Sequence, residues 1–232
     1  MHVHLPKPLH GWREFAGEVG IIVVGVLIAL SAEQVVEAVH WKTELDSERA
    51  SLLQEARDSF EGVAARKNQQ GCVDRRLAEI RTVLDRHHRG EPLGLTGQIS
   101  QPTRQGATRG TWQIALAGQG LSHMSHDEKL KFSDVFSSFD LFDRAEQEEG
   151  DAWRRLTPLN TPDLLTEEDW SGIRTAYGEA VEFNGHLRIL APWMLEKTLP
   201  GLEKYRTDTD LSKFQGYADQ ICKPVLAHSV VH

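Results

Sequence analysis

Hydrophobic residues form one dense block near the start of this chain and recur at spaced positions through the rest of it. Counted from Phe15, the block is 18 residues long, about 27 Å as a helix, and residues 19–32 carry no charge. Trp12 and Trp41 frame it 29 positions apart, roughly 43 Å, near the full thickness of a bilayer with its headgroups. Tryptophan favours both membrane interfaces. The pattern predicts a transmembrane anchor over residues 15–39, with Trp12 and Trp41 as interface anchors.

A cleaved signal peptide is the alternative interpretation of this block. Lys7 and Arg13 precede it, and the run ALS at residues 29–31 offers a small-x-small cleavage site. The sequence after residue 32 nevertheless keeps a helical pattern, with no proline or glycine before Gly62. We therefore expect an uncleaved anchor whose helix continues straight out of the membrane.

Spaced hydrophobic positions after the anchor predict amphipathic helices. The first stripe at helical spacing consists of Leu45, Leu52, Leu53, Ala56, Phe60 and Val63. A second stripe, within residues 72–88, belongs either to a separate helix or to a continuation of the first, because Gly71 would break the helix or bend it. Residues 90–110 have no period and contain two prolines and five glycines, which predicts a loop. A plain surface connection is the simpler interpretation of this loop, and a functional or mobile loop is the alternative.

Capping residues mark the later helices. Thr111 is the expected N-cap of a short helix, and capping-box patterns beginning at Ser125 and Thr166 start two longer ones. A last helix is expected from about residue 210 to Cys222. The helix after Ser125 carries an apolar row rich in phenylalanine: Leu130, Phe132, Val135, Phe136, Phe139 and Phe142. We expect this row in the core, with a cofactor slot as the alternative.

The predicted fold is all-α, because no segment alternates as a strand and no internal repeat is visible. The N-terminal transmembrane helix continues into a long helix that packs in an antiparallel helical bundle. The chain then divides into an N-terminal tail (1–14), the anchor and its exit (15–39), and a helical soluble domain (40–232).

Composition and motifs argue against several classes of function. Lysine and arginine number 26 against 34 aspartate and glutamate, and without a basic block we expect no nucleic-acid partner. The chain has no GxSxG nucleophile motif and no GxxxxGK[ST] phosphate loop, so we expect no enzyme and no cofactor. His123 and His126 are a weak zinc alternative, because a site needs a third ligand that the pattern does not supply.

The two cysteines, Cys72 and Cys222, lack the close spacing of a zinc site or a redox motif. They either pair as a disulfide or stay as two buried thiols. Basic residues on the two sides of the anchor are equal in number, two and two, so charge does not orient it. The start resembles that of a signal anchor, which favours a cytoplasmic N-terminus. In a Gram-negative bacterium the domain would then be periplasmic, where a disulfide persists.

One face of the anchor is small and acidic. At 100° per residue it gathers Glu18, Gly25, Ala29, Ala32 and Glu33, called the anchor face below. Gly25-x-x-x-Ala29 is the small-xxx-small spacing that lets helices approach closely, and a carboxylate in lipid needs a partner. A contact with a membrane protein or a second copy is one interpretation. In the other, Glu18 lies at the headgroups and the small residues have no partner.

The anchor also resembles that of a group of uncharacterised bacterial membrane proteins with the pattern GE-x-x-I-x-V-x-G-V-L-I-A-L. The matching positions are Gly17, Glu18, Ile21, Val23, the run GVLIAL at 25–30, the run AEQ at 32–34 and Trp41. The runs CVDRRL at 72–77 and TWQIAL at 111–116 look like those of alphaproteobacterial members. The resemblance implies an uncleaved single-pass anchor and an all-helical tail, and it implies no activity.

These observations lead to a hypothesis of a single-pass inner-membrane protein. Its partners would be the lipid bilayer and another membrane or envelope protein, or a second copy, to which it serves as an accessory or scaffold subunit. A periplasmic sensor that binds a small ligand beside the phenylalanine row is the alternative.

Overall fold

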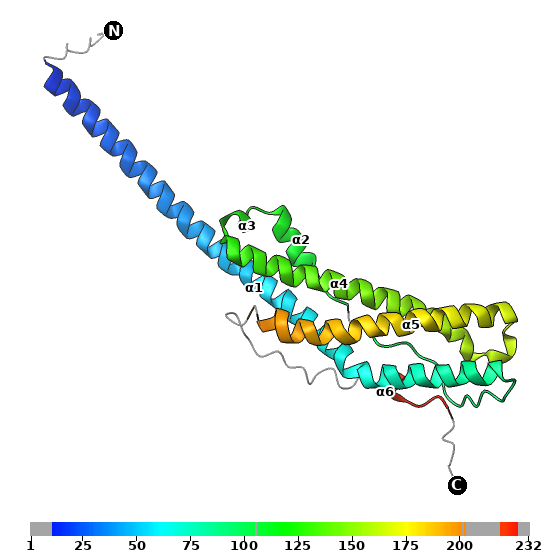
Figure 1. The fold of residues 1–232 in the computed structure, drawn as a ribbon. Coiled ribbons are helices and arrows are strands. Elements are labelled where there is room, and N and C mark those ends of the chain that lie inside the picture. Colours follow the sequence, from blue (N-terminus) through cyan, green and yellow to red (C-terminus); the bar gives the residue numbers. More distant parts are fainter. Residues whose placement is uncertain (1–10, 105, 201, 203–218, 227–232) are drawn as a thin grey trace.

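One continuous helix organises the molecule. The structure, a computed structural model, describes residues 11–104, 106–200, 202 and 219–226. Helix α1, Trp12–His88, has 77 residues and measures about 115 Å along its axis. Its first part projects away from the other helices, and its second half changes direction and packs among them (Figure 1). The helix passes Gly71 without a break, so residues 72–88 are a continuation and the predicted long helix is confirmed.

Two further long helices complete a three-helix bundle with the second half of α1. Helix α4, His126–Leu156, runs parallel to α1, and helix α5, Glu167–Trp193, runs antiparallel to both (Figure 1). The antiparallel arrangement expected from the sequence therefore holds for α5 and is wrong for α4, because the chain after α1 returns along α1 before α4 begins. The shorter elements are α2 (Gly110–Ala117), α3 (Gly120–His123), η1 (Thr157–Asn160), η2 (Pro162–Leu164), η3 (Met194–Thr198) and α6 (Asp219–Cys222). The described residues contain no strand, only an isolated bridge between Leu95 and Leu226. The all-α prediction is confirmed.

The bundle has two hydrophobic clusters, one toward each end. In the cluster nearer the projecting part of α1, Phe60 meets Phe139 edge-on with centroids 4.8 Å apart, and Trp112 stacks on Phe136 at 5.1 Å. The predicted phenylalanine row is buried here, except that Leu130 is half exposed because it lies on the outer side of the first turns of α4. The second cluster joins α1, α4, α5 and the C-terminal segment around Ile80, Trp153, Trp170 and Val225.

Two of the three predicted N-caps form as the sequence indicated, with side chains close in the sequence accepting the free backbone N–H groups. Thr166 forms a full capping box with Asp169, and the Ser125 hydroxyl accepts the Glu128 N–H at 3.4 Å. The prediction of Thr111 as an N-cap is wrong, because α2 begins at Gly110 after Arg109. The Thr111 N–H instead donates to the Glu55 carboxylate of α1 at 3.0 Å, so a distant side chain caps this helix.

Some predicted features lie outside the described residues. These are the tail over residues 1–10, with Lys7, and the start of the last helix near residue 210. Only its end, α6, belongs to the described part of the chain.

Candidate functional site

The first part of α1 is an uncovered apolar surface. Among the described residues, α1 is the one helix long and apolar enough, by length and composition, to cross a membrane. None of its most apolar window is buried. Ile21 and Ile28 are 76% and 65% exposed, although such side chains normally lie inside a protein. A surface of this size requires cover by lipid or by another protein.

The anchor face lies on this exposed part of α1, and all five of its residues are exposed. A Cβ atom built at Gly25 would meet no other atom within 4 Å, and the same holds for Gly20. At 100° per residue Gly20 lies about 140° round the helix from Gly25. The single chain therefore has room for a large side chain on either side of the anchor, and any steric need for Gly25 would come from a partner.

The two predicted interface anchors differ in surroundings. Trp12 is the first residue of α1 and 79% exposed. Trp41 is half buried, because its ring stacks on His123 of α3 with centroids 3.9 Å apart and an interplanar angle of 19°. The indole N–H of Trp41 also donates to Glu37 at 3.3 Å. The stack fixes α3 beside the point where α1 enters the domain.

The loop predicted over residues 90–110 is a hydrogen-bonded strap, defined here as residues 89–104 and 106–109. It runs back along α1 toward the exposed part. Its contacts follow α1 in reverse order: Leu93 with Arg86, Gln98 with Arg76, Thr103 with Gln69 and Thr108 with Ser59. Thr111 and Trp112 then reach Glu55. Side chains along α1 thus replace the hydrogen bonds that regular structure would supply.

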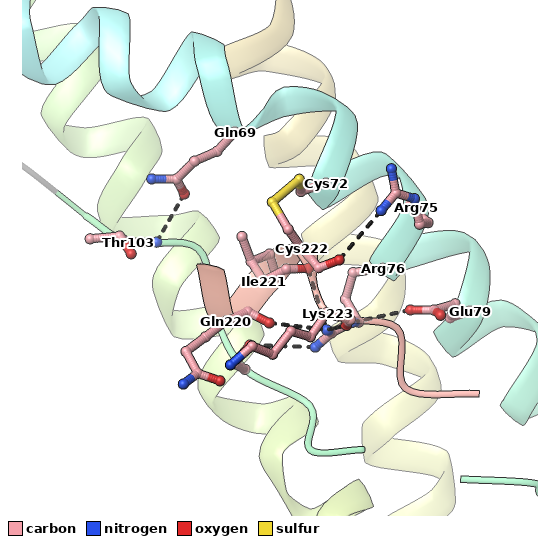
Figure 2. The surroundings of a disulfide bond; sticks show 11 residues. Gln69, Cys72, Arg75, Arg76, Glu79, Thr103, Gln220, Ile221, Cys222 and Lys223 are labelled. Carbon is pink, nitrogen blue, oxygen red and sulfur yellow. Dashed lines mark hydrogen bonds and ion pairs between the residues drawn. A yellow bond between two sulfur atoms is a disulfide. The ribbon is translucent and has the colours of Figure 1, made fainter. Parts of the chain in front are cut away.

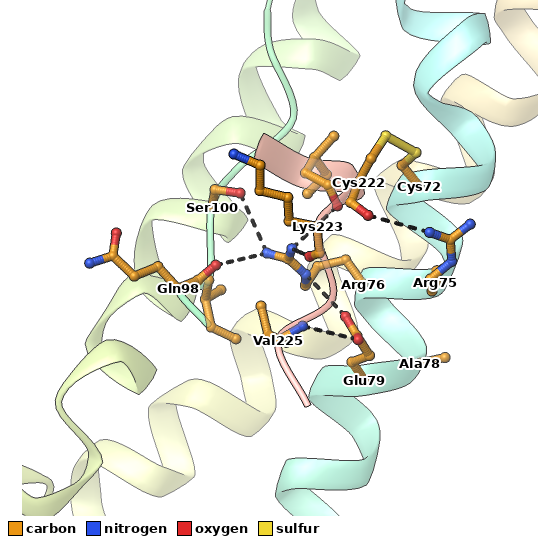
Figure 3. Close-up of polar contacts among 12 residues, drawn as sticks. Cys72, Arg75, Arg76, Ala78, Glu79, Gln98, Ser100, Cys222, Lys223 and Val225 are labelled. Carbon is orange, nitrogen blue, oxygen red and sulfur yellow. Dashed lines mark hydrogen bonds and ion pairs between the residues drawn. A yellow bond between two sulfur atoms is a disulfide. The ribbon is translucent and has the colours of Figure 1, made fainter. Parts of the chain in front are cut away.

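Arg76 joins the strap and the C-terminal segment, residues 219–226, to α1. Arg76 is 1% exposed, and its guanidinium donates to the carbonyl oxygens of Gln98 in the strap and Lys223 in the C-terminal segment (Figure 3). It also donates to the carbonyl oxygens of Gln220 and Ile221 in the same segment. Glu79 accepts from the same guanidinium at 3.2 Å and from the Val225 N–H at 3.1 Å. Burial lowers the pKa of Arg76, and the neighbouring Glu79 opposes that shift.

A disulfide fastens the same segment one turn away. Cys72 and Cys222 are bonded, the first of the two alternatives that the sequence left open (Figure 2). Arg75 donates to the Cys222 carbonyl at 3.4 Å. The strap closes over the far side, where the Thr96 N–H donates to the Val225 carbonyl at 2.8 Å. A Cβ on Gly97 would lie 2.8 Å from the Pro224 carbonyl, so this close approach requires glycine.

A second buried arginine crosslinks the three long helices. Arg66 of α1 is 1% exposed and binds both carboxylate oxygens of Glu149 on α4, at 2.6 and 3.0 Å. It also donates to Asn184 of α5 at 2.9 Å. The Asn184 amide then donates to Asp74 of α1 at 2.8 Å. Charges this deeply buried persist because each is paired and hydrogen-bonded.

The histidines considered as metal ligands take other contacts. His123 stacks on Trp41 as described, and His126 is the exposed first residue of α4. Among the described residues no three His, Cys, Asp or Glu side chains gather in a way that could hold a metal ion.

Sequence reasoning missed the buried charges. Arg66 and Arg76 of α1, and Glu146 and Glu149 of α4, occupy positions that continue the apolar stripes of their helices. A charge at a stripe position was the available signal, because an exposed charge would fall on the opposite face.

Comparisons with protein-family models, with curated proteins and with solved structures found no match to this chain.

Proposed function

We propose that this protein is a single-pass membrane protein whose helical domain serves as an accessory or scaffold subunit for another membrane or envelope protein. The observation that carries the proposal is the fully uncovered apolar part of α1, which continues without a break into the part of the same helix that packs in the bundle. Lipid is the cover that suits a helix apolar nearly all round its circumference.

The proposed location is a bacterial inner membrane, with the N-terminus in the cytoplasm and the domain in the periplasm. The Cys72–Cys222 disulfide supports this orientation, because such bonds persist in the periplasm and are rare in the cytoplasm. The resemblance of the anchor to those of uncharacterised bacterial membrane proteins agrees with it. Alkaline phosphatase fused to the C-terminus should be active in cells, and an inactive fusion would contradict the orientation.

The partner is proposed to bind at the anchor face. Glu18 and Glu33 are acids that a lipid environment disfavours, and Gly25 and Ala29 permit close approach of a second helix. The partner is another membrane protein or a second copy of this chain.

A matched pair of substitutions tests the partner contact. Gly25→Leu places a large side chain on the anchor face, and Gly20→Leu places the same side chain about 140° away, each in open space in the single chain. After crosslinking in native membranes and purification in detergent, the partner should be lost with Gly25→Leu and retained with Gly20→Leu. A strictly monomeric wild-type protein without a stoichiometric partner would refute the proposal.

Intact mass of the same preparation tests the anchor itself. A chain that begins near residue 32 would show cleavage as a signal peptide and would remove the proposed span. A chain that retains its first residues and is extracted only by detergent supports the anchor.

The small-ligand alternative lacks support from the packing. It needs an enclosed pocket beside the phenylalanine row, yet Phe60, Phe136 and Phe139 are each at most 1% exposed and pack ring against ring. The interior at this place is filled by side chains, so we do not propose a ligand there.

A further inference from the structure

A row of four acids runs along α4: Asp140, which is partly exposed, and the buried Asp143, Glu146 and Glu149. Three of them meet an arginine. Asp140 pairs with Arg109 of the strap, Asp143 with Arg104 of the strap at 2.8 Å, and Glu149 with Arg66 of α1 at 2.6 Å. Glu146 is the member of the row that forms no ion pair in the described structure, and it lies in the middle.

Glu146 is almost completely enclosed. It is 4% exposed, its Oε2 accepts the Gly106 N–H of the strap at 3.3 Å, and its Oε1 has no hydrogen-bond partner among the described residues. Glu146 lines a cavity of about 50 Å³ bounded by α1, the strap and α4. That volume accommodates water, because one molecule needs roughly 10 to 15 Å³.

The charges around the cavity discourage a metal cation. The charged groups that face Glu146 are Arg66 from α1, Arg104 from the strap, and Glu149 and Arg154 from α4, while α5 contributes the neutral Asn184 behind Arg66. Asp143 lies behind Arg104, to which it is paired. Arginines outnumber carboxylates among the groups that line the cavity itself, and Arg66 and Arg104 already bind other acids. A proton is the cation that neutralises a carboxylate without requiring a shell of oxygen ligands.

We propose that Glu146 is a proton-binding site and that its charge state controls how firmly the strap is held against α4. The neutral acid tolerates the enclosed cavity. The carboxylate requires water at Oε1, and that water must enter between α4 and the strap near Gly106.

The expected working range lies near neutrality. The pKa of Glu146 is raised to about 7, chiefly by burial and also by the neighbouring Glu149, against the lowering effects of the Gly106 N–H and of Arg66 and Arg104. The strap continues into α2 and α3, and α3 stacks on Trp41 where α1 enters the domain. A looser strap therefore affects the end of the bundle nearest the exposed part of α1. The proposal concerns the domain and stands independently of the anchor.

Hydrogen exchange of the full-length protein in detergent tests this coupling. Wild type and Glu146→Gln, a neutral isostere, are compared at the same pH so that the intrinsic pH dependence of exchange cancels. The quantity compared is the exchange rate of the strap peptide around Gly106 in wild type divided by that in the variant. Between about pH 5.5 and about pH 8.5 this ratio should rise on the order of 30-fold. The expected rise follows from a Glu146 pKa of about 7 when the strap is closed and an ordinary glutamate pKa when it is open. A constant ratio across this range would overturn the proposal.

Two controls sharpen the result. Glu148→Gln changes an exposed acid two residues away on α4 and should exchange like wild type at every pH. Infrared spectroscopy of the wild type does not depend on whether a variant folds. At about pH 6 the spectrum should contain the band of a buried protonated carboxyl group, and this band should disappear by about pH 8.5. Absence of that band overturns the proposal. The same holds if sodium, potassium or calcium at constant pH changes strap exchange in wild type and leaves it unchanged in Glu146→Gln, because the occupant would then be a metal cation.

Discussion

Removal of the disulfide should destabilise the domain and release its C-terminal segment. The bond between Cys72 and Cys222 spans a sequence separation of 150. In the chain-entropy account, a crosslink over a loop of that length restricts the unfolded chain by about 5 kcal/mol, which sets an upper value for the loss. Substitution of both cysteines by alanine removes the bond without leaving a free thiol.

The other attachments of this segment nearly balance the cost of ordering it. Burial of Ile221 and Val225 contributes about 4 kcal/mol. Three carbonyl hydrogen bonds to the Arg76 guanidinium contribute about 5 kcal/mol. Fixing the backbone of residues 219–226 costs about 8 kcal/mol or more. Because these contributions nearly cancel, the covalent bond determines whether the segment stays docked.

Chemical unfolding of the full-length protein in detergent measures the effect. Tryptophan fluorescence is a suitable signal because Trp153 and Trp170 lie in the cluster that the segment covers. The Cys72→Ala/Cys222→Ala variant should lose about 3 to 5 kcal/mol. A reducing agent should shift the wild type equally and leave the variant unchanged. A loss below about 1 kcal/mol would refute the reasoning, since burial and Arg76 would then suffice to hold the segment.

Further substitutions test the buried charges and one helix cap by the same unfolding measurement. Arg66→Met should cost about 3 to 5 kcal/mol because it leaves the buried Glu149 carboxylate unpaired, whereas Arg81→Met, at an exposed site, should change stability by less than about 0.5 kcal/mol. Equal losses would contradict the buried pair. Folding raises the pKa of Glu146 from 4.5 to about 7, so the native chain binds this proton more tightly than the unfolded chain does. Stability should fall as pH rises between these two values, by about 3 kcal/mol in total, and Glu146→Gln should remove that fall; parallel pH curves for the two proteins would disprove the shift. Thr166→Ala should cost about 1 kcal/mol through loss of its capping box and Thr166→Ser much less, and an identical cost for both would exclude the cap as the cause.

Local patterns were sufficient to predict most of the helical architecture. The period of the stripe through Leu52, Ala56 and Phe60 located the long helix and its buried face. The capping residue Thr166 identified the start of α5 to the residue. These features depend on groups within one or two turns, which the sequence displays directly.

The strap could not be predicted, because its backbone partners are distant in the sequence. Glu55 caps α2 from a separation of 56 residues, which is why the local assignment to Thr111 failed. The ion pair between Arg66 and Glu149 spans 83 residues. A stripe position occupied by a charge indicates that such a partner exists, but its identity depends on how the helices are placed in space.

The continuity of α1 gives its two parts a fixed rotational relationship. At 100° per residue, Gln54 on the exposed back of the helix lies within about 20° of both Gly25 and Ala29, while the buried Ala56 and Val63 point to the opposite side. A partner seated on the anchor face would therefore meet the outer surface of α1, and the bundle would point away from it.

For two copies of the chain, this arrangement is a back-to-back pair with both bundles outermost. Ser47, Gln54 and Asp58, which are exposed in the single chain, would then lie along the seam above the membrane. If the anchor rotates about its axis, the exposed face of α1 that contains Gln54 must rotate by the same angle, because both belong to one continuous helix.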